Sequence, residues 1–339
     1  MRRELEMRKL NAGFGLVEIL IAMVLGLMLT IGMTNVFLSS KQAYRTQDAL
    51  SIIQENGRYA MEVLSRNIRM SGYQGCGNLA AVVPNVLASS MPGSGTFSSD
   101  QSIRGYEYDG SAFSPLYGNT GSTSDDPGYV SGQPDPVKDS DVITVSRAER
   151  IDSCGGNLKT AMTSDSDSLT VNGDSSCGLS TNDYVLVTDC ETSDLFRITG
   201  VTKGSSEVQI DHGSTSNKSA RLSKPYSTDA EVFRFIHSDY FVAQNSFGQP
   251  ALFVRENGGT PQELVDGVKE LQLLYGEDTN SDLAADEYVD DPTKISDWAN
   301  VTSVRMTLTL VSKSQNVTID RKAMTQTMTA TVGIRNKLP

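Results

Sequence analysis

The sequence predicts an α+β protein, in which one long N-terminal helix packs on an enlarged antiparallel β-sheet domain with loop-rich insertions. Two observations lead to this prediction. The first is an N-terminal apolar run that changes into an amphipathic pattern at helical spacing. The second is a series of short segments rich in β-branched and aromatic residues, separated by clusters of Gly, Ser, Asn and Asp. At 339 residues, the chain is long enough to bury a sizeable core.

The apolar run predicts a helix that crosses a membrane. Glu18 is the only ionisable side chain between Phe14 and Leu38, and no residue from Ile19 to Ser40 is charged. Since a helix rises about 1.5 Å per residue, about 20 apolar residues cross the hydrocarbon core of a bilayer. A core rarely contains a helix that is apolar on every face at the extreme end of a chain, and a secretory signal peptide has a shorter apolar region followed by a small-residue cleavage site. We therefore expect this helix to remain on the mature protein.

Residues 1–13 form a short charged leader before this helix. The leader has four basic and two acidic side chains, and so a net charge of +2: Arg2, Arg3, Arg8 and Lys9 against Glu4 and Glu6. By the positive-inside rule, the leader lies in the cytoplasm and everything beyond the span lies outside it. Subtracting this +2 from the net charge of −12 leaves −14 on the rest of the chain, which argues against nucleic-acid binding.

Beyond the apolar run, the pattern predicts that the helix continues in amphipathic form. Apolar residues recur largely at three- and four-residue intervals between polar ones: Leu50, Ile53, Ala60, Met61, Leu64 and Ile68. We expect this stripe to dock on the chain's own downstream domain. A continuous helix over residues 14–72 would be about 90 Å long. Three glycines, at positions 26, 32 and 57, lower the helix propensity and leave bending or local melting open.

The remaining chain, residues 73–339, is predicted to be a β-rich domain outside the cytoplasm. Eight segments are expected to be strands: residues 142–145, 184–187, 195–198, 208–210, 232–236, 251–254, 304–310 and 328–332. Residues 263–275 fit both helical and strand patterns, and we expect a short turn or helix that leads into a strand. The domain is expected to divide into a sheet packed on the long helix and an inserted β lobe.

Four cysteines, at positions 76, 154, 177 and 190, lie in this exported domain. An even number of exported cysteines favours disulfides, with three possible connectivities. Proximity in the sequence favours a bridge between Cys177 and Cys190, which leaves Cys76 with Cys154. A zinc site is disfavoured because the chain has no Cys-x-x-Cys pair.

An acidic stretch weakly resembles a calcium-binding loop, whose ligands are oxygen-bearing side chains at alternate positions: Asp278, Asn280, Asp282 and Asp286. Leu283 stands where such a loop has glycine, and Val289 stands where it has a bidentate glutamate. A solvated acidic loop is the alternative, and no other cofactor is expected.

Catalytic patterns are sparse. His237, Ser238 and Asp239 are consecutive, so they should alternate across a strand rather than converge as a hydrolase triad. No glycine-rich phosphate loop is present in the sequence. We therefore expect no enzymatic activity.

The pair Gly13-Phe14, with Glu18 close behind, resembles the processing site of type IV prepilins and their secretion-system relatives. The resemblance implies that a prepilin peptidase cuts after Gly13 and methylates the new N-terminus at Phe14. It also implies that Glu18 is needed for assembly. The family usually has Ser or Thr where this chain has Gly15, a small-for-small change.

Glu18 itself supports this interpretation, because an acid inside a membrane costs roughly 2.5–3.5 kcal/mol and marks a functional site by default. Its natural partner is a positive charge, such as the amino group of Phe14 on a neighbouring subunit. The alternative is a carboxylate that merely extends to the membrane interface.

Further segments resemble PilW-type minor pilins. They are residues 54–61 (QENGRYAM), 64–76 with an arginine pair before GYQGC, 252–256, 264–276 and 331–336. Residues 78–138 and 152–229 contain no matching motif. The resemblance implies a single-pass inner-membrane protein with a periplasmic domain, which then joins the pilus fibre or its tip at the cell surface. Its implied partners are the prepilin peptidase, other minor pilins, the major pilin and a pilus-tip adhesin. A type II secretion pseudopilin and a membrane-anchored periplasmic adhesin or binding protein are the alternatives.

Overall fold

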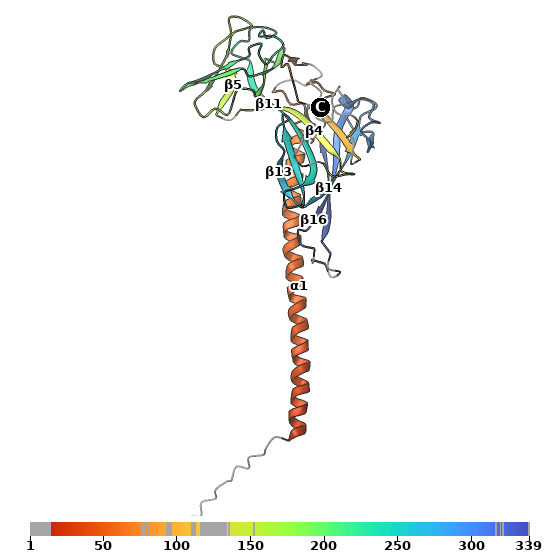
Figure 1. The fold of residues 1–339 in the computed structure, drawn as a ribbon. Helices are drawn as coiled ribbons and strands as arrows, with labels where there is room; N and C mark the ends of the chain where they lie inside the picture. The colour runs from red at the N-terminus through yellow and green to blue at the C-terminus, as the bar shows by residue number, and fades with distance from the viewer. Residues whose placement is uncertain are drawn as a thin grey trace, which may run out of the picture. The chain divides into compact units, whose positions relative to one another are not determined.

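The computed structural model describes residues 15–75, 79, 82–92, 97–109, 113–115, 134, 136–151, 153–315, 317–318, 320 and 322–337. One long helix and a large, mostly antiparallel β structure make up this part of the chain (Figure 1), which confirms the α+β prediction. The chain divides into two compact units. The first is residues 1–51 with 314–324, and the second is residues 52–313 with 325–339.

Helix α1 runs from Leu16 to Arg69 as 54 residues without a break. At about 1.5 Å per residue it is about 80 Å long, and the prediction that the apolar helix continues in amphipathic form is confirmed. The helix ends because Gly72 adopts a left-handed conformation, with φ 72°. The Gly72 N–H then leaves the helix and donates to the carbonyl oxygen of Ser146 at 2.9 Å.

The first unit contains helix residues 16–51 and the loop that connects two C-terminal strands, β16 (Val301–Val311) and β17 (Thr325–Gly333). The side chains of Gln42 and Thr46 both donate to the Val317 carbonyl oxygen, Thr46 at 2.9 Å. Val317 is buried. The loop is therefore attached to the helix just beyond its uncharged stretch.

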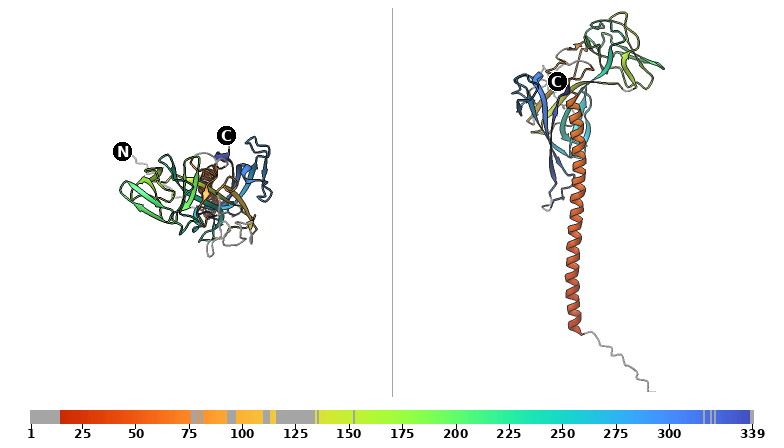
Figure 2. Two further views of the ribbon diagram at one scale, coloured as in Figure 1. Left: turned by 90° about the horizontal axis from the view of Figure 1, so that it is seen from above. Right: turned by 180° about the vertical axis from the view of Figure 1, so that it is seen from behind.

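The second unit contains two sheets. The smaller has the order β15-β14-β16-β17, with β15 at Glu287–Val289 and β14 at Val268–Glu277. Figures 1 and 2 show β14 and β16 beside the upper part of α1. The Asn56 side chain donates to the Asp266 carbonyl oxygen at 3.0 Å, next to the turn into β14. This sheet is the surface on which the second half of the helix packs.

The larger sheet is organised around β11 (Glu231–Gln244), which pairs with β4 (Val142–Glu149), β5 (Cys154–Leu158), β7 (Tyr184–Thr188) and β12 (Pro250–Glu256). Its other described strands are β1 (Asn85–Val86), β2 (Ile103–Tyr108), β3 (Phe113–Ser114), β6 (Leu169–Gly173), β8 (Ser193–Arg197), β9 (Gly200–Lys203), β10 (Glu207–Asp211) and β13 (Gln262–Asp266). Only β1 with β8 is a parallel pair among the described strands. Each of the eight predicted strand segments overlaps one of these elements.

Residues 150–230 form an insertion between β4 and β11, which pair with each other. The insertion carries strands β5 to β10 and contributes most of a hydrophobic core that includes Leu169, Val185, Phe196 and Ile210. These four side chains are fully buried. The expectation of an inserted β lobe agrees with this arrangement.

The expected turn that leads into a strand is present at Gly267, directly before β14, and the residues before this turn form strand β13. β13 pairs with β12, and the chain reverses at Gly267, where φ is 77°. A Cβ at Gly267 would lie 2.8 Å from the Val311 carbonyl oxygen, so this approach requires glycine. The helix-like spacing of residues 263–275 is overridden by pairing with strands that are distant in the sequence.

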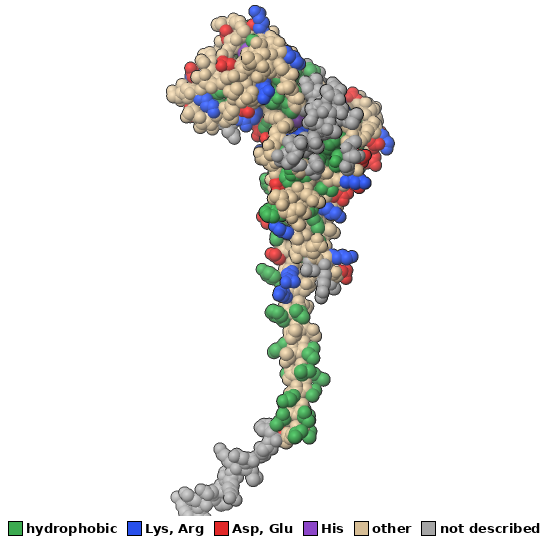
Figure 3. All heavy atoms as spheres, viewed as in Figure 1, with side chains coloured by type: hydrophobic (Ala, Val, Ile, Leu, Met, Phe, Trp, Pro, Cys, Tyr) green, Lys and Arg blue, Asp and Glu red, His purple; other side chains and the backbone are tan. Residues whose placement is uncertain are grey.

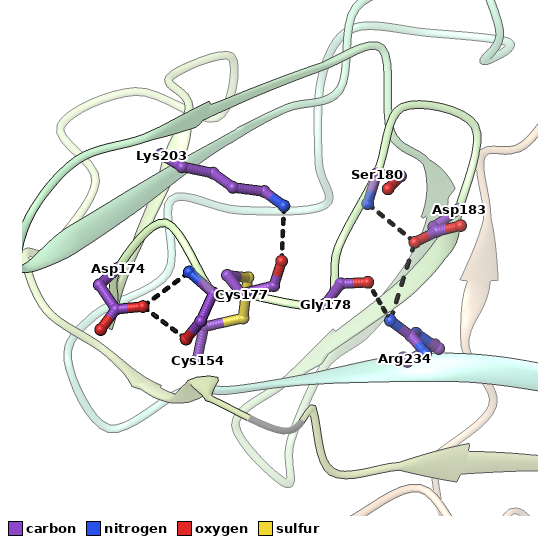
Figure 4. Close-up of a disulfide and its surroundings, with 9 residues drawn as sticks. Cys154, Asp174, Cys177, Gly178, Ser180, Asp183, Lys203 and Arg234 are labelled. Carbon is purple, nitrogen blue, oxygen red and sulfur yellow. Dashed lines mark hydrogen bonds and ion pairs between the residues drawn. A yellow bond between two sulfur atoms is a disulfide. The ribbon is translucent and has the colours of Figure 1, made fainter.

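The predicted disulfide pairing is wrong. Cys154 is bonded to Cys177, so neither the Cys177–Cys190 bridge nor the Cys76–Cys154 bridge forms (Figure 4). Pairing of β5 with β6 returns the chain to Cys154, whose Cα lies 5.1 Å from that of Cys177. The extended strand β7, about 17 Å long, lies between Cys177 and Cys190 and separates them. Cys190 is also disulfide-bonded, and Cys76 lies outside the described residues.

Candidate functional site

The N-terminal part of α1 is an apolar surface that the described part of the chain leaves exposed. Its large hydrophobic side chains between Leu16 and Leu38 are exposed, from 47% at Ile19 to 76% at Met33 (Figure 3). None of its most apolar stretch is buried, and the helix is long and apolar enough to cross a membrane. Exposed apolar area is unfavourable in water by roughly 25 cal/mol per Å². This segment therefore requires lipid or other apolar helices around it, as in a membrane anchor.

Polar groups within this segment are satisfied inside the helix. Thr30 donates its hydroxyl to the Gly26 carbonyl oxygen, and Thr34 donates to the Thr30 carbonyl oxygen, both at 2.8 Å. Such bonds remove the need for an external partner in a hydrocarbon environment. A Cβ at Gly26 or Gly32 would meet no atom within 4 Å, so both glycines lie on open helix surface.

Glu18 lies in the first turn of α1. The Gly15 carbonyl oxygen accepts from the backbone N–H of Glu18 at 3.0 Å and of Ile19 at 3.2 Å, which starts the helix here. The positive end of the helix dipole favours a carboxylate at this position. Nothing in the described part of the chain forms an ion pair or a hydrogen bond with the Glu18 side chain. Gly13 and Phe14 lie outside the described residues, so cleavage and methylation stay predictions.

The second half of α1 docks on the domain through one stripe of buried residues: Ile53, Gly57, Ala60, Leu64 and Ile68. Their spacing of three or four places them on one face of the helix. All of these residues except Gly57 belong to the predicted apolar stripe, so the expectation that this stripe packs on the chain's own domain is confirmed.

Gly57 was expected only to weaken the helix, but the structure gives it a packing role. A Cβ at this position would lie 2.5 Å from the Met328 Sδ and 3.1 Å from the Leu310 Cδ1. Glycine therefore lets the helix approach strands β16 and β17 closely.

The structure brings together two segments that the sequence analysis related to the pilin family. The side chain of Asn336 donates to the Ser71 carbonyl oxygen at 2.9 Å, which joins the C-terminal motif to the end of α1. Gly75, in the motif after the arginine pair, has φ 94°, and a Cβ there would lie 2.3 Å from Phe233. Both motifs therefore have a structural explanation in how the helix end joins the sheets.

The acidic loop folds around its own side chains. Asp278 accepts from the backbone N–H of Ser281 at 2.6 Å and of Leu283 at 2.9 Å. Asp286 accepts from the Thr279 N–H at 2.8 Å and from the Asn280 side chain at 2.8 Å. Leu283 has φ 68°, in the conformation that the glycine of a calcium loop adopts.

Asn280 and Asp282 make similar local bonds, because their side-chain oxygens accept from the backbone N–H of Asp282 and of Ala284, both at 2.9 Å. No group of three or more His, Cys, Asp or Glu side chains able to hold a metal ion is found among the described residues. Calcium binding by this loop stays a prediction.

A buried polar chain crosses from β4 to β12. The Ser146 hydroxyl lies 2.8 Å from His237 Nδ1, and His237 Nε2 lies 3.0 Å from an oxygen of Asp239. Arg255 donates through Nε to the other oxygen of Asp239 at 2.8 Å. Burial opposes ionisation of Asp239, but His237 and Arg255 together hold its pKa below the ordinary value. Ser238 lies in this segment but not in the chain of bonds.

The sequence analysis did not identify Ser146 or Arg255 as partners of His237 and Asp239. The available signal was the spacing of two, which places His237 and Asp239 on one face of a strand. All four side chains are buried, Ser146 to 2% exposure, so the hydroxyl is closed to a substrate. The arrangement is suited to holding β4, β11 and β12 together.

These features define a membrane-anchored protein with one long N-terminal helix and a β-rich domain C-terminal to it. Residues 239–336 match the family model of Type IV Pilus-assembly protein W (PilW). The matched segment begins within β11 and ends in the short 3₁₀ helix η3 (Arg335–Lys337). The match supports a type IV pilus-related protein that takes part in pilus assembly and interacts with other pilus components. No curated protein and no solved structure matches the chain.

Proposed function

We propose that the chain is a minor pilin, which helps to initiate type IV pilus assembly and is incorporated into the tip or priming complex. The observation that carries this proposal is the single helix α1, whose first half is exposed and apolar and whose second half is docked on the domain. Such a helix can exchange a lipid environment for a bundle of similar helices without refolding the domain. The family match over residues 239–336 supports the same class of protein.

In this proposal, the prepilin peptidase removes the leader after Gly13, and the domain waits on the periplasmic side of the inner membrane. Glu18 then pairs with the amino group of Phe14 on a neighbouring subunit. An unpaired carboxylate is costly inside an apolar bundle, whereas a paired one is stabilised, so this contact would set the axial register. The proposed function requires no catalysis by this chain.

The test replaces Glu18 by Ala in the full-length protein and measures how much of it enters sheared pili and how much stays in the membrane. We expect incorporation to fall at least tenfold while the membrane level is unchanged. Glu55→Ala is the matched control, because Glu55 is an exposed acid on the same helix beyond the apolar stretch. Equal incorporation of the Glu18→Ala and unaltered proteins would contradict the proposed role.

Mass spectrometry of the purified mature protein tests processing independently, with an N-methylated N-terminus at Phe14 as the expected result. Deletion of the gene separates the alternatives. Loss of surface pili and twitching supports a minor pilin, and failed export of secreted enzymes would indicate a type II secretion pseudopilin. Loss of one ligand-binding activity with normal pili would indicate an adhesin or binding protein.

A further inference from the structure

An open groove lies beside the C-terminal end of α1 and holds five arginines. It has a volume of about 910 Å³ and is bounded by the last turns of the helix, the end of β4 and η3. The arginines come from these three elements: Arg66, Arg69, Arg147, Arg150 and Arg335. The two acidic side chains that line it are Glu62 and Glu149, so the lining has a net charge of +3. The chain after residue 13 has a net charge of −14, so the groove is opposite in sign to the protein around it.

The arginines of the groove are not neutralised by strong internal ion pairs. The Arg147 guanidinium lies 3.4 Å from Glu149, and that of Arg150 lies 3.3 Å from Glu231. Charge-assisted hydrogen bonds are normally about 2.7–2.9 Å long, so these two pairs are loose. Within the described part of the chain, Arg66, Arg69 and Arg335 form no ion pair.

The helix dipole explains only part of this cluster. Basic side chains in the last turn of a helix are favourable by about 0.3–1 kcal/mol, which accounts for Arg66 and Arg69. The helix dipole does not account for Arg147, Arg150 and Arg335. These three arginines lie in or next to β4 and η3, outside the helix. Five guanidinium groups around one groove repel one another, and an anionic ligand would relieve that repulsion.

We propose that this groove binds an acidic segment of a neighbouring protein. Guanidinium groups bind carboxylates through two parallel hydrogen bonds, which selects carboxylates by geometry as well as by charge. Val63, Met70, Tyr73 and Ala148 also line the groove and provide contacts for apolar side chains between the acidic ones. A nucleic acid or an anionic lipid surface is disfavoured because the net charge of −14 on the chain after residue 13 repels a large polyanion over a distance.

The chain itself contains a segment with this composition. Residues 277–291 contain seven Asp or Glu residues and no Lys or Arg, together with apolar side chains at Leu283, Tyr288 and Val289. The proposal goes beyond the minor-pilin function. Binding of such a segment can be measured on the isolated protein, so its outcome does not depend on whether Glu18 is needed for incorporation into pili.

The experiment uses the full-length protein in detergent and a fluorescent peptide with the sequence of residues 278–291. A hexaglutamate peptide serves as a second probe, and a peptide with Asn and Gln in place of every Asp and Glu is the control. Fluorescence anisotropy at low salt should show binding of the two acidic peptides and at least tenfold weaker binding of the amide peptide. Binding should weaken further as the salt concentration rises.

The variant Arg69→Gln/Arg335→Gln should weaken binding of both acidic peptides at least tenfold. Arg335→Lys should weaken binding less than Arg335→Gln, because lysine keeps the charge but loses the two parallel hydrogen bonds of the guanidinium group. Arg221→Gln is the matched control, since Arg221 is an exposed arginine that does not line this groove, and its effect should be less than twofold. Thermal unfolding checks that every variant is folded.

Three results would overturn the proposal. The first is that neither acidic peptide binds the unaltered protein. The second is that Arg221→Gln weakens binding as much as the groove variant, which would show general charge attraction. The third is that a single-stranded oligonucleotide binds the groove more tightly than both peptides.

Discussion

Replacement of Asp141 by Asn should remove a pH dependence from the stability of the domain. Asp141 lies just before β4 and is only 8% exposed. Its backbone N–H donates to the Leu271 carbonyl oxygen at 2.9 Å, and its side chain accepts from the Leu273 N–H at 2.7 Å. These two bonds provide partners for backbone groups of Leu271 and Leu273 on the edge of β14, where β15 does not pair with it. Burial raises the pKa of Asp141 to about 7, although the Leu273 hydrogen bond opposes this rise.

The direction of the effect follows from the raised pKa. The neutral form of Asp141 is favoured in the folded state, so its stabilising contribution is complete below about pH 4 and is lost as the pH rises to about 7. The difference between 3.8 and about 7 corresponds to about 4 kcal/mol, at about 1.36 kcal/mol per pKa unit. About 3 kcal/mol of this loss falls between pH 5 and pH 8. Asn keeps an acceptor for Leu273 but does not ionise.

Urea unfolding of the protein in detergent, followed by tryptophan fluorescence, measures this difference. The single tryptophan, Trp298, is buried and its ring lies 4.9 Å from that of Tyr275 in β14, so its signal reports on this part of the domain. The free energy of unfolding of Asp141→Asn minus that of the unaltered protein should rise by about 3 kcal/mol from pH 5 to pH 8. Asp139→Asn is the control, because Asp139 is exposed. A change below about 1 kcal/mol for Asp141→Asn would refute the reasoning.

Three further substitutions test the packing, with the same unfolding measurement. Gly105→Ala should destabilise the domain by about 3 kcal/mol, because a Cβ there would lie 1.7 Å from the hydroxyl of the buried Tyr275; a loss under about 1 kcal/mol would contradict this close approach. Gly57→Leu should lower the free energy of unfolding by about 2 kcal/mol. Gly57→Ala should lower it clearly less, because the facing Met328 side chain is flexible and alanine favours the helix. The reverse order would show that the helix does not pack here as described. Leu283→Gly should leave stability unchanged or raise it by up to about 1 kcal/mol, since Leu283 has φ 68°, whereas Ala284→Gly next to it should lower stability.

The helix could be predicted from the sequence because its signals are local. The charge-free run after Glu18 and the three- and four-residue spacing up to Ile68 depend only on neighbours within a few turns. The eight strand segments were found for the same reason, from β-branched content and alternation. The docking of the apolar helix stripe on the β-rich domain could also be predicted, since an apolar stripe outside the membrane is stable only when another apolar surface covers it.

Contacts between distant segments could not be predicted in this way. The bridge from Cys154 to Cys177 depends on the pairing of β5 with β6, and proximity in the sequence indicated a different partner. The partner of His237 is Ser146, which lies opposite it in the register of β4 and β11. The arginine groove likewise forms only when Arg335 is brought to the end of α1, and no local pattern shows that.

The position of β11 has a mechanical consequence for the insertion of residues 150–230. Its first residues, 231–234, pair with β7, and residues 234–240 pair with β4 without a break in the strand. The insertion is therefore tied to the rest of the second unit by a continuous ladder and not by a flexible tether. A tensile force directed along β11 would load the hydrogen bonds between β11 and β4 together, in shear. Strands loaded in this way resist separation better than strands that are peeled apart one bond at a time.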